Sequence, residues 1–220
     1  MTAGRAASGN REFLAHLAEH PIIAILRAPD ATRFLDVSRV LYDAGCRTVE
    51  FTMTTAGALE AVATATDRLP RDMAVGVGTL RTAAQAEAAV VAGARFLVSQ
   101  SFRAEVTVVA TRLDVAYIPG ALTPTEIVTA FDSGPPAVKV SPIGVNGGLA
   151  YFDELRAPMP DIPLLPTGAV RLDEVNAYLD RGAVAVGLSG SLIDDAVRAE
   201  GDLRGLARRT ARTVERARNR

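Results

Sequence analysis

One lysine stands alone among the cationic residues of this chain. Lysine and arginine together number 24, and all of them except Lys139 are arginine. Lys139 lies in AVKVSP (137–142), an apolar and β-branched run that is typical of a buried strand. Lysine can lose its proton where burial disfavours the charged form, whereas arginine cannot. Because a neutral amine attacks a ketone to form a Schiff base, Lys139 is a candidate nucleophile.

A carboxylate is predicted to share the interior with this lysine. In TVEFTM (48–53) the apolar side chains alternate with Glu50, which therefore points to the opposite face, as Lys139 does relative to Val138 and Val140. Glu50 would then move the protons of an imine reaction. Two structural alternatives stay open: Glu50 could pair with an arginine, and Lys139 could be a solvated strand end.

Alternating strands and helices must position these two residues. Amphipathic segments separate the strands, and four of them end at a glycine of the kind that closes a helix: Gly45, Gly93, Gly134 and Gly182. The predicted strands are 22–27, 48–53, 74–80, 95–100, 115–120, 137–142, 162–168 and 183–189. Eight such units predict an α/β fold of parallel strands, a single-domain (β/α)8 TIM barrel. A doubly wound open sheet is the rival, but no G-x-G-x-x-G follows the first strand.

We expect one domain over residues 1–220. It divides into an N-terminal segment with an extra helix (1–20), the barrel (21–195) and a C-terminal helix (196–220). The basic C-terminus could suggest nucleic-acid binding, but its apolar spacing favours an amphipathic helix with a solvated arginine face.

Composition excludes several classes of protein. The formal net charge of −1, without long blocks of one sign, gives no indication of a nucleic-acid or membrane partner. A single cysteine, Cys46, excludes an internal disulfide, and no apolar run suits a secretory signal or a transmembrane helix, so we expect a cytoplasmic protein. The two histidines, His16 and His20, fall in the predicted N-terminal helix, so no metal site is predicted at the strand ends.

Polar residues collect near the carboxyl ends of several predicted strands. Strand alternation places Arg27 on the same strand face as Ile23 and Ile25, and Thr79 on the same face as Val75 and Val77. It places Thr167, late in the seventh strand, on the same face as Leu165. Active sites of TIM barrels form at this end, although threonine also has a high β-propensity of its own.

Eight motifs in order resemble the 2-keto-3-deoxy-6-phosphogluconate (KDPG) and 4-hydroxy-2-oxoglutarate aldolase family, from about residue 21 to 195. They are PIIAILRAPD, TVEFTMTT, GVGTL, FLVSQSF, YIPGALTPTE, AVKVSPIG, LLPTGAV and AVGLSGSLI. The resemblance implies a metal-independent class I lyase that needs no cofactor beyond a covalent imine on Lys139, with Glu50 as acid and base. It also implies a homotrimer. In addition, it implies that the substrate carboxylate is bound by Arg27 and Thr79. The substrate phosphate would be bound by Thr167, Gly168, Ala169, Gly187 and Ser189, and the rest of the pocket would be lined by Thr54, Gln100, Pro119 and Ser141.

The chain departs from the family pattern at three pocket positions. Thr54 stands where an arginine is frequent, Gln100 replaces a proline, and Ser141 replaces an aromatic residue. A further change, Ala169 for the second glycine after P-T-G, leaves the backbone N–H groups able to bind phosphate. These changes keep the lysine chemistry and predict a more polar pocket.

The resemblance therefore implies cleavage of a KDPG-type sugar acid into pyruvate and an aldehyde such as glyceraldehyde 3-phosphate. Within the family the alternatives are a 4-hydroxy-2-oxoglutarate and a phosphogalactonate aldolase. Outside it they are a phosphosugar isomerase or epimerase that uses Glu50 as base, and a non-catalytic metabolite-binding barrel.

Overall fold

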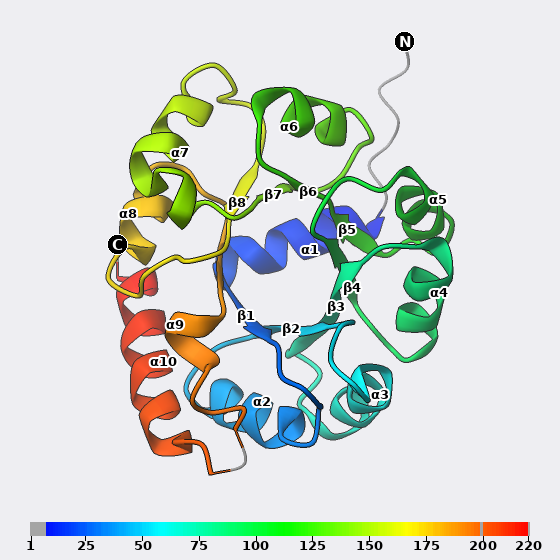
Figure 1. Ribbon diagram of the computed structural model, residues 1–220, viewed down its shortest axis with the longest axis vertical. Helices are drawn as coiled ribbons and strands as arrows, with labels where there is room; N and C mark the ends of the chain where they lie inside the picture. Colours follow the sequence, from blue (N-terminus) through cyan, green and yellow to red (C-terminus); the bar gives the residue numbers. More distant parts are fainter. Residues whose placement is uncertain (1–7, 199, 220) are drawn as a thin grey trace.

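Parallel strands curve into a barrel in the computed structural model of the chain (Figure 1). The structure describes residues 8–198 and 200–219, so parts of the predicted N- and C-terminal segments lie outside the described residues. The strands are β1 Ile22–Leu26, β2 Thr48–Thr52, β3 Ala74–Leu80, β4 Phe96–Ser99, β5 Ala116–Ile118, β6 Gly120–Ala121, β7 Val138–Val140, β8 Leu164–Pro166 and β9 Val186–Leu188. The predicted TIM barrel with a helix before β1 is confirmed.

The barrel wall consists of two hydrogen-bonded sheets. The larger has the order β5-β4-β3-β2-β1-β9, and the smaller has the order β6-β7-β8. The predicted strand 115–120 is divided into β5 and β6 at Pro119, which has no N–H to donate to a neighbouring strand. The Pro119 carbonyl still accepts the Lys139 N–H at 2.9 Å, and a bridge between Thr167 and Gly187 joins the sheets on the other side.

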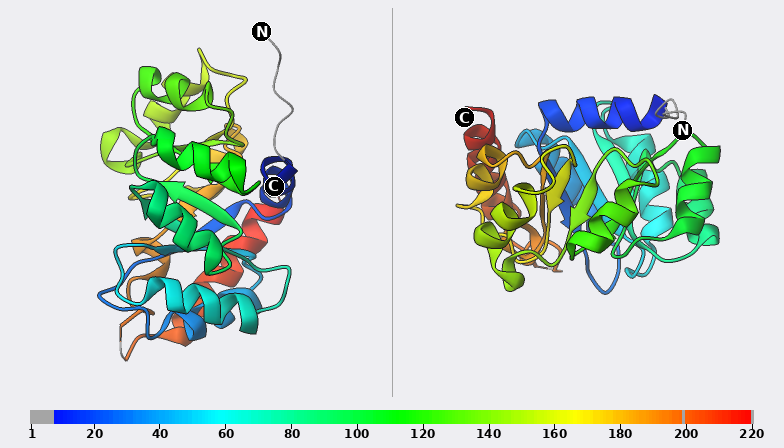
Figure 2. Two further views of the ribbon diagram at one scale, coloured as in Figure 1. Left: turned by 90° about the vertical axis from the view of Figure 1, so that its right-hand side faces the viewer. Right: turned by 90° about the horizontal axis from the view of Figure 1, so that it is seen from above.

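Helices surround the barrel, and α1 lies across one of its ends (Figures 1 and 2). Helix α6 shows how the sequence sets a boundary, since the Thr123 side chain and Glu126 form a capping box before Pro124 in the first turn. The four glycines predicted to close helices all have positive φ. The helices are α1 Ser8–Glu19, α2 Phe34–Asp43, α3 Ala58–Arg68, α4 Ala83–Val91, α5 Ala104–Arg112, α6 Pro124–Phe131, 3-10 helix η1 Gly144–Asn146, α7 Gly148–Arg156, α8 Val175–Asp180, α9 Gly190–Ile193 and α10 Leu203–Arg218.

The C-terminal helix α10 buries the predicted apolar face, including Leu206 and Val214, and contacts α2 and α8. It begins at Leu203, later than the expected residue 196, and Asp202 caps it by accepting the Gly205 N–H at 2.7 Å. In the described part of the chain, no helix has both the length and the apolar character required to cross a membrane.

Strand alternation divides the apolar side chains into two cores. The larger core fills the layer between the strands and the helices and contains Val49, Phe51, Val138 and Val140. The smaller core fills the barrel interior. Its members are Phe13, Leu17, Ile23, Ile25, Ala74, Phe96, Val98, Ala116, Ile118, Leu165 and Ala185. Because Phe13 and Leu17 of α1 belong to the interior core, one end of the barrel is closed and polar chemistry is confined to the other.

Candidate active site

A cavity of about 530 Å³ opens at the carboxyl ends of the strands. It brings together nine of the residues expected from the sequence, which come from seven strands or the segments that directly follow them. The lining residues are Ile25, Arg27, Thr54, Thr79, Gln100, Lys139, Ser141, Pro142, Thr167, Gly168, Ser189, Gly190 and Asp194. A site of this composition, with one amine at its base and polar groups around it, suits a small polar substrate.

Lys139 and Glu50 meet inside the barrel. Their residues are 4% and 2% exposed, and Lys139 Nζ lies 3.9 Å from Glu50 Oε1. Glu50 Oε1 is buried and has no hydrogen-bond partner in the structure, so it can accept a proton or a hydrogen bond from a bound molecule. The structure thus pairs Glu50 with the lysine rather than with an arginine, and it buries Lys139 rather than placing it at a solvated strand end.

The strands around Lys139 and Glu50 position this pair. Lys139 is the central residue of β7 and aligns with Gly120 of β6 and Leu165 of β8. Glu50 belongs to β2, and Gly78 of the adjacent strand β3 lies against it. A Cβ atom at position 78 would overlap with the Glu50 carboxylate. A glycine within a strand can mark such a close approach, so this sequence signal was available and was not used.

Arg27 and Thr79 form a second polar pair on the cavity wall. Arg27 Nη2 donates to Thr79 Oγ1 at 3.2 Å. Strict alternation would turn Thr79 outward, since Val75 and Val77 pack in the outer core. Thr79 instead has φ of 62°, and the β3–β4 register shifts between Val77 and Leu80. This left-handed residue is what brings the hydroxyl into the cavity, and strand parity alone could not predict it.

The residues that depart from the family pattern also line the cavity. Gln100 Nε2 donates to Ser141 Oγ at 3.3 Å, and Thr54 Oγ1 lies 3.4 Å from Thr52 Oγ1. Gln100 and Ser141 also line an adjacent cavity of about 360 Å³, so they form part of the wall between the two spaces. The wall carries polar groups, as the sequence predicted.

Four of the expected site residues do not line the cavity: Glu50, which lies behind the lining residue Lys139, and three residues expected around the substrate. Ala169 is exposed with φ of 55°, and Pro119 is buried behind Lys139. Gly187 lies behind Thr167, where a Cβ atom would overlap with the Thr167 hydroxyl. Thr167 itself is 4% exposed, and its hydroxyl has no hydrogen-bond partner. The role of Gly187 here is to leave room for Thr167.

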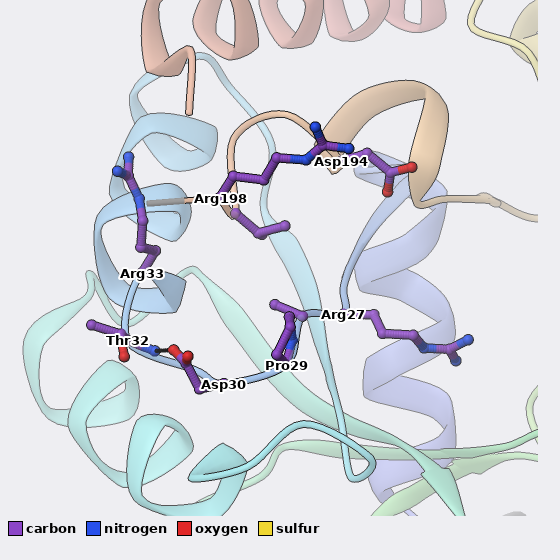
Figure 3. Close-up of a pocket in the computed structure, with 9 residues that line it drawn as sticks. Arg27, Pro29, Asp30, Thr32, Arg33, Asp194 and Arg198 are labelled. Atoms are coloured by element: carbon purple, nitrogen blue, oxygen red, sulfur yellow. Dashed lines mark hydrogen bonds between the residues drawn. The ribbon is translucent and has the colours of Figure 1, made fainter. Parts of the chain in front are cut away.

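Sequence reasoning missed Asp194 at the edge of the cavity. Asp194 follows α9 directly, beyond the last strand, so neither strand parity nor a motif pointed to it. Asp194 and Arg27 also line a neighbouring cavity of about 700 Å³, together with Asp30, Arg33 and Arg198. Figure 3 shows Arg27 on one side of this second cavity and Arg33 on the other.

Comparison with known proteins agrees with this fold. A family model described as KDPG and KHG aldolase matches residues 14–208. A 2-dehydro-3-deoxy-phosphogluconate aldolase from Treponema pallidum is 33% identical over 159 residues, 72% of this chain and 74% of the relative. A probable 2-dehydro-3-deoxy-6-phosphogalactonate aldolase from Rhizobium meliloti is 31% identical over 190 residues, 84% of this chain and 87% of the relative.

The fold is also found in a crystal structure of KDPG aldolase from Legionella pneumophila, which holds pyruvate as a covalent carbinolamine. It superposes with a TM-score of 0.83 at 21% identity and covers 91% of this chain and 97% of its own. The match of the family model over most of the chain, on a barrel of the same fold, shows that this protein is an aldolase of the KDPG and KHG aldolase family.

Proposed function

We propose that this aldolase cleaves 2-keto-3-deoxy sugar acids to pyruvate and an aldehyde through a Schiff base on Lys139. The observation that carries the proposal is the buried pair formed by Lys139, which lines the cavity, and Glu50, with Lys139 Nζ 3.9 Å from Glu50 Oε1. The six-carbon sugar acids cleaved by the named relatives support this substrate class, and 4-hydroxy-2-oxoglutarate is the alternative within the family. The homotrimer and the cytoplasmic location expected from the sequence belong to the same proposal.

The reaction begins with the amine of Lys139. Nζ attacks C2 of the keto acid, and the carbonyl oxygen takes up a proton from water to give a carbinolamine; the final hydrolysis of the iminium returns this proton to water. Loss of that oxygen as water leaves an iminium between Nζ and C2. Glu50 is the carboxyl group in position to take the proton from the attacking nitrogen and to return it to the departing oxygen.

Cleavage follows because the iminium accepts electrons. Glu50 removes the proton of the C4 hydroxyl, C4 leaves as an aldehyde, and the electron pair of the C3–C4 bond moves toward C2 to form an enamine. Glu50 then returns its proton to C3. Addition of water to the resulting iminium releases pyruvate and restores the free amine, so the water lost in the first stage is replaced.

Arg27 and Thr79 are proposed to hold the C1 carboxylate. A guanidinium with two parallel N–H groups matches a carboxylate, and Thr79 already accepts one Arg27 N–H at 3.2 Å. Binding at this point would fix C2 toward Lys139. The interior apolar core beneath them keeps bulk water away from the amine.

The test uses the single lysine of the chain. Incubation with pyruvate and borohydride, followed by peptide mapping, is expected to give a reduced adduct on the peptide that contains Lys139. Lys139→Arg keeps the positive charge but cannot form an imine, so turnover is expected to fall by several orders of magnitude with no adduct.

Two results would contradict the proposal. Aldol cleavage by the Lys139→Arg variant would exclude the Schiff base and favour a base mechanism on Glu50. Absence of the adduct from folded wild-type protein would show that Lys139 does not react with the keto acid.

A further inference from the structure

One charged side chain that lines the active-site cavity has no role in the proposed cleavage. Its charged lining residues are Lys139, Arg27 and Asp194. The proposed cleavage uses Lys139 for the imine and Arg27 for the C1 carboxylate. Asp194 faces the same space and takes part in neither step.

Asp194 lies on the side of the cavity formed by the segments after β8 and β9. It lines this side together with Gly168, Ser189 and Gly190, and its N–H donates to the Gly190 carbonyl at 3.3 Å. Its carboxylate folds over Gly190, where an added Cβ would lie 2.9 Å from Asp194 Oδ2.

This is the side on which TIM barrels frequently bind a substrate phosphate. A carboxylate there repels a phosphate or a second carboxylate, because like charges at short range are unfavourable. The same carboxylate is a strong acceptor for a hydroxyl group. Asp194 therefore reverses the preference that the fold would otherwise give to this end of the cavity.

A second observation on this side also points to a hydroxyl ligand. Thr167 Oγ1 is buried, lines the cavity and has no hydrogen-bond partner. A threonine hydroxyl can both donate to and accept from a substrate hydroxyl. With Asp194 as acceptor and Thr167 and Ser189 as further partners, this end of the cavity suits a neutral polyol better than an anion.

Two further arginines lie outside the active-site cavity. Arg33 and Arg198 line the neighbouring cavity and not this one, and Asp194 lines both.

We infer that Asp194 is a specificity-determining residue, which selects 2-keto-3-deoxy sugar acids that end in a free hydroxyl over those that end in a phosphate or a carboxylate. The inference rests on the proposed Schiff-base cleavage and deepens it by naming the distal end of the substrate. It replaces the phosphorylated substrate that the family resemblance led us to expect.

The experiment compares cleavage of 2-keto-3-deoxygluconate with cleavage of its 6-phosphate, with pyruvate measured by a coupled lactate dehydrogenase. The wild-type enzyme is expected to have the higher kcat/KM for the unphosphorylated acid. Asp194→Asn is expected to shift the ratio of the two kcat/KM values toward the 6-phosphate by about tenfold or more, mainly through KM. Asp195→Asn removes the next, exposed carboxylate, which does not line the cavity, and is the matched control with an unchanged ratio.

Contrary outcomes are distinct from a failure of the proposed function. A wild-type preference for the 6-phosphate that Asp194→Asn leaves unchanged would overturn the role of Asp194. If the wild-type enzyme prefers the 6-phosphate and the Arg198→Gln variant loses this preference, the phosphate binds in the neighbouring cavity. That result would also overturn the role of Asp194. Failure of the Schiff base itself would appear instead as the absence of a pyruvate adduct on wild-type Lys139.

Discussion

At the scale of single residues, the site depends on where side chains are missing as much as on where they are present. Glu50 can occupy the barrel interior because Gly78 contributes no Cβ. Removing one partner of a buried ion pair usually costs about 3–5 kcal/mol, since the other charge stays buried without compensation. The interior must therefore keep both Lys139 and Glu50 in place, and their geometry is sensitive to small changes of volume around them.

Gly78→Ala tests this sensitivity. The added methyl group would overlap with the Glu50 carboxylate, so the carboxylate must move. A misplacement of about 1 Å costs roughly 100-fold in rate, and we expect a loss of kcat of that size in a folded variant. Steady-state kinetics and a thermal unfolding curve measure the two effects separately.

Gly76→Ala is the control on the same strand. The three atoms nearest to a Cβ at position 76 all belong to the Phe96 ring, with which it would overlap. This variant should lose stability, by about 1–3 kcal/mol for an overpacked core, while it keeps kcat close to the wild-type value. An equal loss of kcat in both variants would show that the effect is general strain in β3.

At the scale of elements, α1 completes the barrel by covering the end opposite the active site. Phe13 stacks on Phe96 with ring centroids 4.5 Å apart, and Leu17 is fully buried. The helix therefore supplies part of the interior core that the short strands cannot fill by themselves.

Leu17→Ala is expected to destabilise the protein by about 2–5 kcal/mol, because it leaves a cavity in a core that cannot collapse fully. The measurement is the free energy of unfolding from urea titration. Leu14→Ala makes the same chemical change on the same helix at a partly buried position and should cost clearly less. Similar losses in the two variants would mean that α1 contributes by helix propensity rather than by filling the barrel.

The order of strands and helices could be predicted from sequence, whereas irregular backbone could not. Hydrophobic alternation and helix-closing glycines are local signals, and they identified the eight strand positions and the inward faces of Glu50 and Lys139. Thr79 enters the cavity only through its left-handed backbone, which is a property of the closed β3–β4 pair. Asp194 has no periodicity to reveal it, because it follows a single turn of helix outside the repeating units.

At the scale of the whole molecule, the folded state is sensitive to acid through the two histidines near the closed end. Burial lowers the pKa of His16 below the ordinary value of 6.5, and the nearby His20 adds to this shift. Burial also lowers the pKa of His20, with further contributions from Arg218 and Arg47. The unfolded chain therefore binds these protons at higher pH than the folded chain does.

Stability is consequently expected to fall as the pH drops through about 6.5 and to stop falling from this cause once both histidines are protonated in the folded state. Urea unfolding at about pH 7.5 and about pH 5.5 measures the difference. In a variant that carries His16→Gln and His20→Gln, the difference should shrink. A drop of the same size in that variant would assign the acid sensitivity to other groups.

The division of the barrel wall into two sheets has a consequence for the chemistry. Lys139 belongs to the three-stranded sheet and Glu50 to the six-stranded sheet, so the 3.9 Å between their polar atoms spans the gap between two separately hydrogen-bonded units. The sheets are joined at Pro119 and at the Thr167–Gly187 bridge, both of which lie next to cavity-lining residues. The proposed nucleophile and the proposed acid therefore belong to different sheets, and a small separation of the two sheets would lengthen the distance between them while every strand remained folded.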